Sequence, residues 1–396
     1  MSRIFSRTDK SFLSQWWWTV NHGMLAGVVV LIVLGFIMAL AASPAVAQHI
    51  GKPIYFFAYK QLAFLFLAFG VFLVVSMLPI KQIRHLAYLV CALSIIAIMA
   101  TLVFGFTAKG ASRWLLIGGL SVQPSEFLKP GFVVVCASLM AQNRAHLDGY
   151  GTVQSFILLA GAALLLAAQP DIGQMTLLCL VWCCLYFLAG GSIGRLSLLV
   201  LIGGGIAFIF YATMPHVASR IDRFFDPSSG DTYQVDRAMD AIKSGGVVGV
   251  GFGNGQVKSI LPDAHSDYVF AVATEEGGLM IGVLIIVLFG FLVWRGLASS
   301  RNEYEHWIQL SAAGLACMFG LQAAINLAVN LNLMPSKGMT LPFISYGGSS
   351  LLASALMMGM LVGLMRRRAG TDIRMRHLSG MAATNNLATN SLGRQL

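Results

Sequence analysis

The chain has 396 residues, 57% of them hydrophobic and only 11% charged, and its mean hydropathy is +0.76. A soluble protein of this length carries about 25% charged residues, so the composition excludes the soluble globular class. The formal net charge of +10 does not indicate nucleic-acid binding, because the positive residues lie in short segments and tails beside apolar runs. The runs are continuous and do not alternate, which predicts an all-α polytopic membrane protein and excludes a transmembrane β-barrel.

Ten apolar runs come close to the roughly 20 residues that a helix needs to cross a bilayer. They predict transmembrane helices over residues 23–43, 55–79, 86–106, 125–141, 153–168, 172–190, 194–214, 268–294, 306–332 and 348–365. The first run is longer than the roughly 7–15 residues of a signal-peptide core, so we expect it to be retained although Ala45-Val46-Ala47 resembles a cleavage site. Gln169-Pro170-Asp171 is the only break between the fifth and sixth runs, and proline ends a helix readily.

The distribution of Lys and Arg between alternate segments predicts the orientation. One set of segments holds Arg3, Arg7, Lys10, Lys81, Arg84, Arg144, Arg195, Arg295, Arg301, Arg366, Arg367, Arg368, Arg374, Arg376 and Arg394. The alternate short segments hold only Lys52, Lys109, Arg113 and Lys337. Both termini are therefore expected in the cytoplasm, with a large extracytoplasmic loop over 215–267 between spans 7 and 8.

Three parts of the chain follow from this topology. Residues 1–22 are expected to form a cytoplasmic N-terminal segment, and Trp16, Trp17 and Trp18 suit the aromatic belt at a membrane interface. Residues 23–366 are expected to form one ten-helix membrane domain. The polar segment 367–396 has little apolar periodicity and is expected to be a disordered cytoplasmic tail.

The six cysteines all lie in apolar runs, at Cys91, Cys136, Cys179, Cys183, Cys184 and Cys317. Their spacing indicates neither a disulfide framework nor a set of metal ligands. We interpret them as small apolar packing residues, and no metal site is predicted.

Charged residues inside the fourth predicted span are costly to bury and are therefore functional candidates. Glu126 and Lys129 are three residues apart, so they share a helix face and can pair. Two interpretations stay open and are compatible: a structural ion pair that locks the bundle, or a pair that lines a cavity for an anionic headgroup.

Three other acidic residues, Glu275, Glu276 and Asp171, have structural interpretations that need no role in catalysis. Glu275 and Glu276 fall in the predicted eighth span and point to different faces, so at least one must face protein or water. We expect one of them to be a hydrogen-bonded interior carboxyl. Asp171 precedes a predicted helix and is expected to cap it.

The most informative polar stretch is the loop 215–267, which holds seven of the chain's 16 acidic residues. Its last residue, Asp267, runs without a spacer into the apolar Tyr268-Val269-Phe270-Ala271, so it lies at a membrane–water boundary. An enzyme whose substrate is half lipid and half sugar needs a base at that height. From the residues alone, an ordinary helix N-cap by Asp267 or Ser266 explains the position at least as well.

Two Gly-rich or Pro-rich segments lie on the same predicted side. Gly249, Gly251, Gly253 and Gly255 superficially match a nucleotide-binding loop, but no βαβ unit flanks them, so we expect closely packed or flexible backbone instead. The segment 334–350 is apolar yet carries helix-breaking residues, and we interpret it as a re-entrant loop beside the site.

Several motifs together resemble the SEDS family (shape, elongation, division and sporulation) of membrane glycosyltransferases. They are "LPFISYGGSS" at 341–350, "GASRW" at 110–114, "QPSEFLK" at 123–129, "QPDIG" at 169–173 and "LPDAHSDYVFAVATEEGG" at 261–278. The run from Arg7 to Gly27 resembles the division-type branch found in alphaproteobacteria. Asn332 and Ser336 stand where the family more often has other small residues, which affects subfamily details only.

The resemblance implies a peptidoglycan glycosyltransferase that polymerises lipid II, with Asp267 as the essential acid. On this interpretation Asp267 is a general base for an inverting displacement. Residues that would hold the pyrophosphate or the sugars are Arg113, Lys129, Glu126, Lys258, Gln234, His265 and Ser345. No cofactor is required by the sequence, although a divalent cation, Mg or Mn, could share the charge of the leaving group.

The resemblance also implies partners and a place in the cell. The partners would be a class B penicillin-binding protein with transpeptidase activity and other divisome proteins, without nucleic acid. The place would be the bacterial inner membrane at the division septum. Two other classes of function stay open, a lipid II flippase and a non-catalytic divisome scaffold, and an elongation role is not excluded.

Overall fold

The computed structural model describes residues 11–49, 51–108, 111–142, 149–226, 232–261, 263–335 and 338–366. Outside these residues lie Arg3, Arg7, Lys10, Lys109, Arg144, Ser336, Lys337 and the tail 367–396. The chain divides into two units, residues 1–22 with 365–396 and residues 23–364.

In the first unit, the described helix is α1 (Phe12–Thr19). It begins where the Ser11 side chain accepts a hydrogen bond from the Ser14 N–H, as a helix N-cap does. Trp16, Trp17 and Trp18 lie on it, and the Trp17 ring meets the His22 ring edge-on at 4.7 Å.

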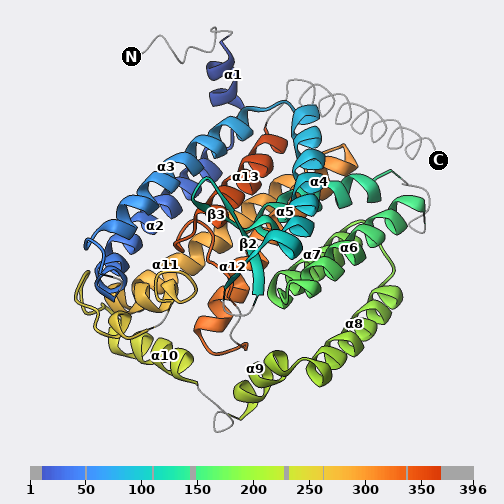
Figure 1. Ribbon diagram of the computed structural model, residues 1–396. Helices are drawn as coiled ribbons and strands as arrows, with labels where there is room; N and C mark the ends of the chain where they lie inside the picture. The colour runs from blue at the N-terminus through green and yellow to red at the C-terminus, as the bar shows by residue number, and fades with distance from the viewer. Residues whose placement is uncertain are drawn as a thin grey trace, which may run out of the picture. The chain divides into compact units, whose positions relative to one another are not determined.

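The second unit is mostly helical (Figure 1). Its α-helices are α2 (His22–His49), α3 (Phe56–Met77), α4 (Ile80–Phe104), α5 (Pro124–Met140), α6 (Tyr150–Ala168), α7 (Ile172–Leu188), α8 (Ile193–Thr213), α9 (Pro215–Phe225), α10 (Tyr233–Gly245), α11 (Val269–Ser300), α12 (His306–Asn330) and α13 (Gly348–Leu364). A helix covers each of the ten runs expected to span a membrane. By length and composition, seven helices in the described chain can cross a membrane, namely α2, α3, α4, α6, α8, α11 and α12.

Three short strands make the expected all-α class wrong in one detail. β1 (Phe106–Ala108), β2 (Ala111–Ile117) and β3 (Leu120–Val122) form an antiparallel sheet in the order β1-β2-β3. Gly118 and Gly119 form the two-residue connection between β2 and β3, and both have positive φ, which this kind of turn requires. The strands join the end of α4 to the start of α5, and they carry Arg113.

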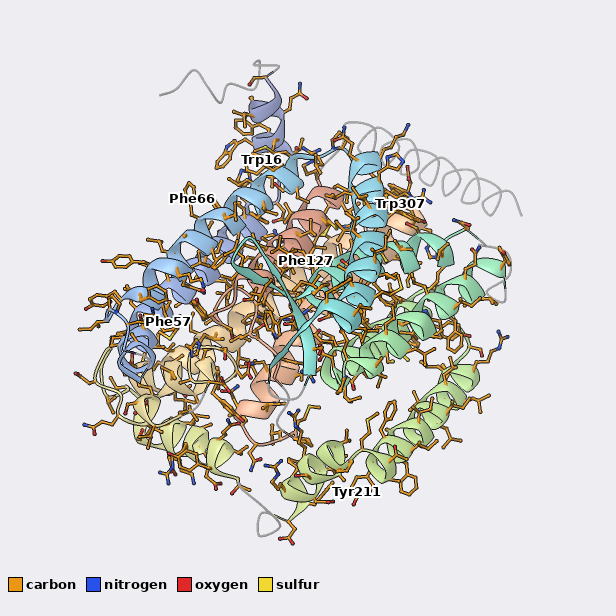
Figure 2. The ribbon with its side chains drawn as sticks, in the orientation of Figure 1. Trp16, Phe57, Phe66, Phe127, Tyr211 and Trp307 are labelled. Atoms are coloured by element: carbon orange, nitrogen blue, oxygen red, sulfur yellow. The ribbon has the colours of Figure 1, made fainter. Side chains whose placement is uncertain are left out.

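The centre of this unit is built from α5, α12 and α13, which are buried on nearly all faces. α5 packs against α4, and α13 packs against α3. Gly131 allows the first of these contacts, because a Cβ there would lie 2.8 Å from the backbone nitrogen of Cys91. Close helix packing through small residues is the usual solution in membranes. At the periphery, large apolar side chains point outward, as Phe66 of α3 does (Figure 2).

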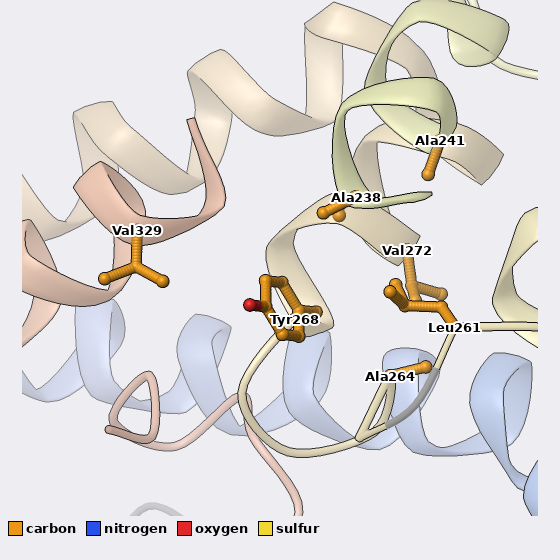
Figure 3. Close-up of a cluster of buried hydrophobic side chains, with 8 residues drawn as sticks. Ala238, Ala241, Leu261, Ala264, Tyr268, Val272 and Val329 are labelled. Carbon is orange, nitrogen blue, oxygen red and sulfur yellow. The ribbon is translucent and has the colours of Figure 1, made fainter. Parts of the chain in front are cut away.

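The segment 215–267, expected as a loop, contains two helices, α9 and α10, and a 3-10 turn, η2 (Val257–Ser259). α10 docks through small residues on a cluster of buried side chains (Figure 3). The cluster consists of Ala238, Ala241, Leu261, Ala264, Tyr268, Ala271, Val272 and Val329. Through it α10 is packed on the beginning of α11 and the end of α12, next to Asp267.

The eighth predicted span, 268–294, coincides with a helix that is interrupted near its beginning. Helix α11 runs from Val269 to Ser300, but Gly278 has φ 69° and ψ −174°, so the helix is broken there. Glu275 and Glu276 precede the break and do not lie in the uninterrupted apolar part, 279–300. The expected span did not anticipate the break because Val269–Ala273 and the stretch from Leu279 onward are both apolar, although Glu275, Glu276, Gly277 and Gly278 separate them.

Candidate functional site

Asp267 closes a tight turn that leads into α11. The Asp267 N–H donates to the Asp263 carbonyl at 3.1 Å, and Asp263 has a left-handed φ of 55°, which Asp tolerates better than most residues. The Asp267 side chain is half-buried. Its Oδ2 lies 3.3 Å from the position that a Cβ on Gly338 would take. The carboxylate therefore lies against the segment that precedes α13, where a side chain at position 338 would crowd it.

Positive charge gathers near this carboxylate. Arg220 of α9 is in electrostatic reach of Asp267 and of Arg113. The largest effect on the pKa of Arg220 is partial desolvation, which lowers it. The like charges of Arg113 and Arg223 lower this pKa further, whereas the negative charge of Asp267 raises it. Because Arg220 is exposed, solvent screening limits these effects. The arrangement can attract an anionic group to the side of Asp267.

The pKa of Tyr268, the neighbour of Asp267, also responds to the charges around this site. Its side chain is buried in the cluster of Figure 3. Burial raises the pKa of Tyr268 to about 12, and the negative charges of Asp267 and Asp263 raise it in the same direction. The phenol therefore stays protonated at neutral pH and is no candidate base.

A row of side-chain amides on α12 holds the Asp267 backbone. Asn326 and Asn330 donate to the Asp267 carbonyl at 2.9 and 3.0 Å. Asn326 also donates to the Met339 carbonyl at 2.6 Å, and Gln322 donates to the Thr340 carbonyl at 3.1 Å. These amides tie the turn before α11 to the segment 338–347.

Residues 322, 326 and 330 are spaced by four, so they share one face of α12. None of the three was among the candidates expected from the sequence. The signal was present, because three amides at helical spacing in an apolar helix indicate a polar face.

The predicted ion pair of Glu126 and Lys129 is confirmed. Lys129 Nζ lies 2.7 Å from Glu126 Oε2 and 2.8 Å from Gln322 Oε1, and Gln174 Nε2 donates to Glu126 Oε1 at 2.6 Å. Glu126 and Lys129 are both almost completely buried. A buried pair of this kind is tolerated because neighbouring amides satisfy its remaining polar atoms. Gln322 links it to the amide row that ends at Asp267.

Arg113 of β2 is attached to the break between α6 and α7. It donates to the carbonyls of Gln169 (3.2 Å) and Pro170, and its Nη1 lies 3.8 Å from Asp171 Oδ1. Asp171 occupies the expected N-cap position of α7; its side chain makes no regular capping hydrogen bond, although the Gln174 N–H, three residues further on, still stabilises the carboxylate. Asp171 Oδ2 also accepts from Gln123 Nε2 at 3.4 Å and from Ser125 Oγ at 3.5 Å.

Glu275 and Glu276 are both interior carboxylates, whereas the sequence analysis favoured that role for only one. Glu275 accepts three backbone hydrogen bonds, from Gln256 (2.7 Å), Val257 (2.8 Å) and Lys258 (3.2 Å). Glu276 pairs with Lys258, whose Nζ also donates to the Ala41 carbonyl at 3.0 Å. Lys258 is thus buried within the fold, beside α2 and the start of α11, and the structure does not bring it to Asp267.

Two other residues expected to contact the substrate, Ser345 and His265, are held by hydrogen bonds and ring contacts that involve the turn 341–346. Ser345 Oγ donates to the Ser266 carbonyl at 2.5 Å and accepts from the Leu341 N–H at 2.8 Å. The His265 carbonyl accepts from the Tyr346 N–H at 2.8 Å, and the His265 ring packs beside the Phe57 and Tyr346 rings. The segment 338–346 is irregular and largely buried, as the re-entrant interpretation requires.

Gln234 lies in the first turn of α10 and is half-buried. Within the described ranges, no three His, Cys, Asp or Glu residues converge in a way that could hold a metal ion.

Comparison with known proteins places this arrangement in a family. Residues 22–369 match the family model of FtsW, RodA and SpoVE, described as "Cell cycle protein". A probable peptidoglycan glycosyltransferase FtsW of Caulobacter vibrioides is 41% identical over 375 residues, which cover 93% of this chain and 95% of the relative. A protein of the same description from Hahella chejuensis is 33% identical, with 87% and 89% covered.

Solved structures share the fold. The rod shape determining protein RodA of Thermus thermophilus has a TM-score of 0.66 and 26% identity, with 88% of this chain and 97% of that chain covered. A chain from a structure described as the coordination of polymerization and crosslinking by a peptidoglycan synthase complex has a TM-score of 0.70 and 24% identity, with 87% and 97% covered. The match extends over almost the entire length of both solved chains.

Proposed function

Because this chain belongs to the FtsW, RodA and SpoVE family of cell cycle proteins, we propose that it is an FtsW-type peptidoglycan glycosyltransferase that polymerises lipid II during cell division. The reaction joins a sugar hydroxyl to the anomeric carbon that carries an undecaprenyl pyrophosphate. The hydroxyl is a poor nucleophile, so the step needs a base, and the departing pyrophosphate needs positive charge. One inverting displacement converts the α-linked donor into a β-linked glycan.

The observation that carries this mechanism is the position of the Asp267 carboxylate. It lies at the beginning of α11, against Gly338, with Arg220 and Arg113 in the same electrostatic cluster. A carboxylate that takes the hydroxyl proton contributes typically ~10²–10⁴-fold to the rate. Arg220, which the sequence analysis did not select, joins Arg113 as a cation for the pyrophosphate.

The other candidates take different roles in this proposal. The Glu126–Lys129 pair of α5 is almost completely buried and is connected to the Asp267 turn through Gln322 and the amide row of α12, which supports a structural role. Ser345 and His265 are hydrogen-bonded around the turn before Asp267, which supports positioning of that turn more than contact with the sugars. Lys258 is paired with Glu276 inside the fold and takes no part in substrate contact. Gln234 on α10 is retained as a sugar contact.

The proposed topology follows the distribution of Lys and Arg. All ten helices α2 to α8 and α11 to α13 cross the membrane, both termini are cytoplasmic, and Asp267 lies on the outer side. The bacterial inner membrane at the septum is the proposed location. A class B penicillin-binding protein is the proposed transpeptidase partner, alongside other divisome proteins.

Polymerisation of lipid II by the purified protein with its transpeptidase partner tests the proposal. We expect glycan chains from the natural chain and a loss of roughly 10²-fold or more for Asp267→Asn. Asp263→Asn is the matched control, because Asn also tolerates the left-handed backbone and should keep most of the rate. Wild-type rates from a folded Asp267→Asn would remove Asp267 from the chemistry, and lipid II translocation without any glycan would favour a flippase.

A further inference from the structure

The break in α11 is bridged by another part of the chain. At Gly278 the helix loses its regular hydrogen bonds, and the backbone of 246–251 supplies replacements. The N–H groups of Val250 and Gly251 donate to the carbonyls of Glu275 and Glu276, both at 3.0 Å. The Leu279 and Met280 N–H groups donate to the carbonyls of Gly246 and Val247, at 2.9 and 3.4 Å.

The bridging segment presents apolar side chains outward. We call residues 247–252 the apolar loop; its apolar members are Val247, Val248, Val250 and Phe252. All four are exposed, with Val248 at 76% and Phe252 at 56%. Gly249 and Gly251 have positive φ, and the backbone at Gly249 lies against the Glu276 carbonyl. Glycine thus lets the backbone pack tightly on α11 while the apolar side chains face away from the protein.

The hydrogen bonds fix the height of the apolar loop relative to the membrane. The uninterrupted helix from 279 to 300 has 22 residues and is about 33 Å long at 1.5 Å per residue, which suffices to cross the ~30 Å hydrocarbon core. Its first residues, Leu279 and Met280, are apolar and exposed, so they face lipid. Because they bond directly to Gly246 and Val247, the apolar loop lies at the level where this span enters the bilayer.

We propose that the apolar loop inserts into the hydrocarbon of the leaflet on the Asp267 side and holds Asp267 at a fixed height above the lipid. The occupant of this exposed apolar surface is therefore the acyl region of the bilayer. The insertion of the apolar loop depends only on the fold, whereas its role in holding Asp267 at a fixed height rests on the proposed function.

A continuous set of contacts leads from the apolar loop to Asp267. The loop holds the carbonyls of Glu275 and Glu276, and the Glu275 side chain binds the three N–H groups of 256–258. The Leu261 N–H donates to the Val257 carbonyl at 3.0 Å, and Leu261 packs in the buried cluster with Tyr268. A displacement of the loop out of the lipid would be transmitted along this path to the turn that carries Asp267.

Insertion is tested by a nitroxide spin label at Val248→Cys in proteoliposomes of the full chain. Lys243→Cys is the matched control, since Lys243 is exposed, charged and lies in the last turn of α10. We expect the label at 248 to collide mainly with dissolved oxygen and the label at 243 mainly with a water-soluble nickel chelate. The native cysteines lie in helices, and the same labelling of the parent chain gives their background.

Preferential collision of the 248 label with the nickel chelate would overturn the insertion. So would low accessibility to both reagents, because the loop would then be covered by protein and not by lipid.

The role of the apolar loop in holding Asp267 at a fixed height is tested by measuring lipid II polymerisation by the Val248→Asp and Val248→Leu variants. A carboxylate at the loop tip opposes insertion, and a misplacement of about 1 Å can cost up to 10²-fold, so we expect the Asp variant to lose roughly tenfold or more while the Leu variant keeps its rate. An equal rate for both variants, with the label readout intact, overturns the role in positioning. Absence of polymerisation by the natural chain would instead contradict the proposed function and leave the insertion result standing.

Discussion

The side chain of Asn326 donates a hydrogen bond to the backbone carbonyl of Asp267 over 2.9 Å, across 59 residues of sequence. The bond fixes the backbone of the candidate base without using its carboxylate. Asn330 reinforces the contact from the next turn of α12. The turn that carries the candidate base is therefore held in place through its backbone, and a general base needs such positioning.

Replacing this amide should reduce turnover more than substrate binding. We expect Asn326→Leu to lower kcat for lipid II polymerisation by roughly ten- to a hundredfold with a smaller change in KM, because the base is displaced and not removed. Gln309→Leu, a half-buried amide at the opposite end of α12, is the control. Equal kinetics for both variants would show that the Asn326 contact does not position Asp267.

The buried pair of Glu126 and Lys129 predicts non-additive effects on stability. Lys129→Met leaves the Glu126 charge buried and uncompensated, which costs about 3–5 kcal/mol of the free energy of unfolding. The double variant Glu126→Gln with Lys129→Met removes both charges and should lose less than the single variant. Denaturant unfolding in detergent micelles measures this, with the exposed Lys243→Met as a control expected within about 0.5 kcal/mol of the parent. Strictly additive losses would contradict the coupling.

Gly278 is expected to tolerate no side chain. Its φ of 69° disfavours other residues, and a Cβ there would collide with the Val247 carbonyl. Gly278→Ala should therefore lower the thermal unfolding midpoint and weaken the docking of the apolar loop. Gly290→Ala, later in the same helix, meets nothing within 4 Å and should be neutral or slightly stabilising. A fluorescence-detected melting curve compares the two, and unchanged melting of Gly278→Ala would argue against the break.

Tyr268 provides a pH-dependent readout of the charge on Asp267. Burial and the nearby carboxylates raise its pKa from 10.0 to about 12, so the folded protein keeps the phenol proton that the unfolded chain loses first. The contribution of Tyr268 to stability is therefore complete below pH 10 and falls as the pH rises toward 12. We expect Asp267→Asn to move the Tyr268 pKa downward, while burial keeps it above 10.0. The tyrosinate absorbance difference between each protein and its Tyr268→Phe version gives the pKa, and an unmoved value would mean that the two groups do not interact.

The sequence by itself determined the helices and their order. Run length and hydropathy respond to the local requirement that a membrane-spanning segment satisfy its own backbone, and each of the ten runs is helical. Glu126 and Lys129 were also predictable as a pair, because a spacing of three places both on one helix face. The family motifs directed attention to Asp267 before any geometry was known.

Only the tertiary structure decided which partners surround the candidate base. Asn326, Asn330 and Gly338 meet Asp267 across 59 to 71 residues, Arg220 reaches it from α9, and Lys258 turns away to Glu276. The break at Gly278 was also hidden, since its backbone bonds are supplied by residues 246–251. Periodicity records which face of one helix is apolar, whereas these contacts depend on how distant segments pack, and no local pattern carries that information.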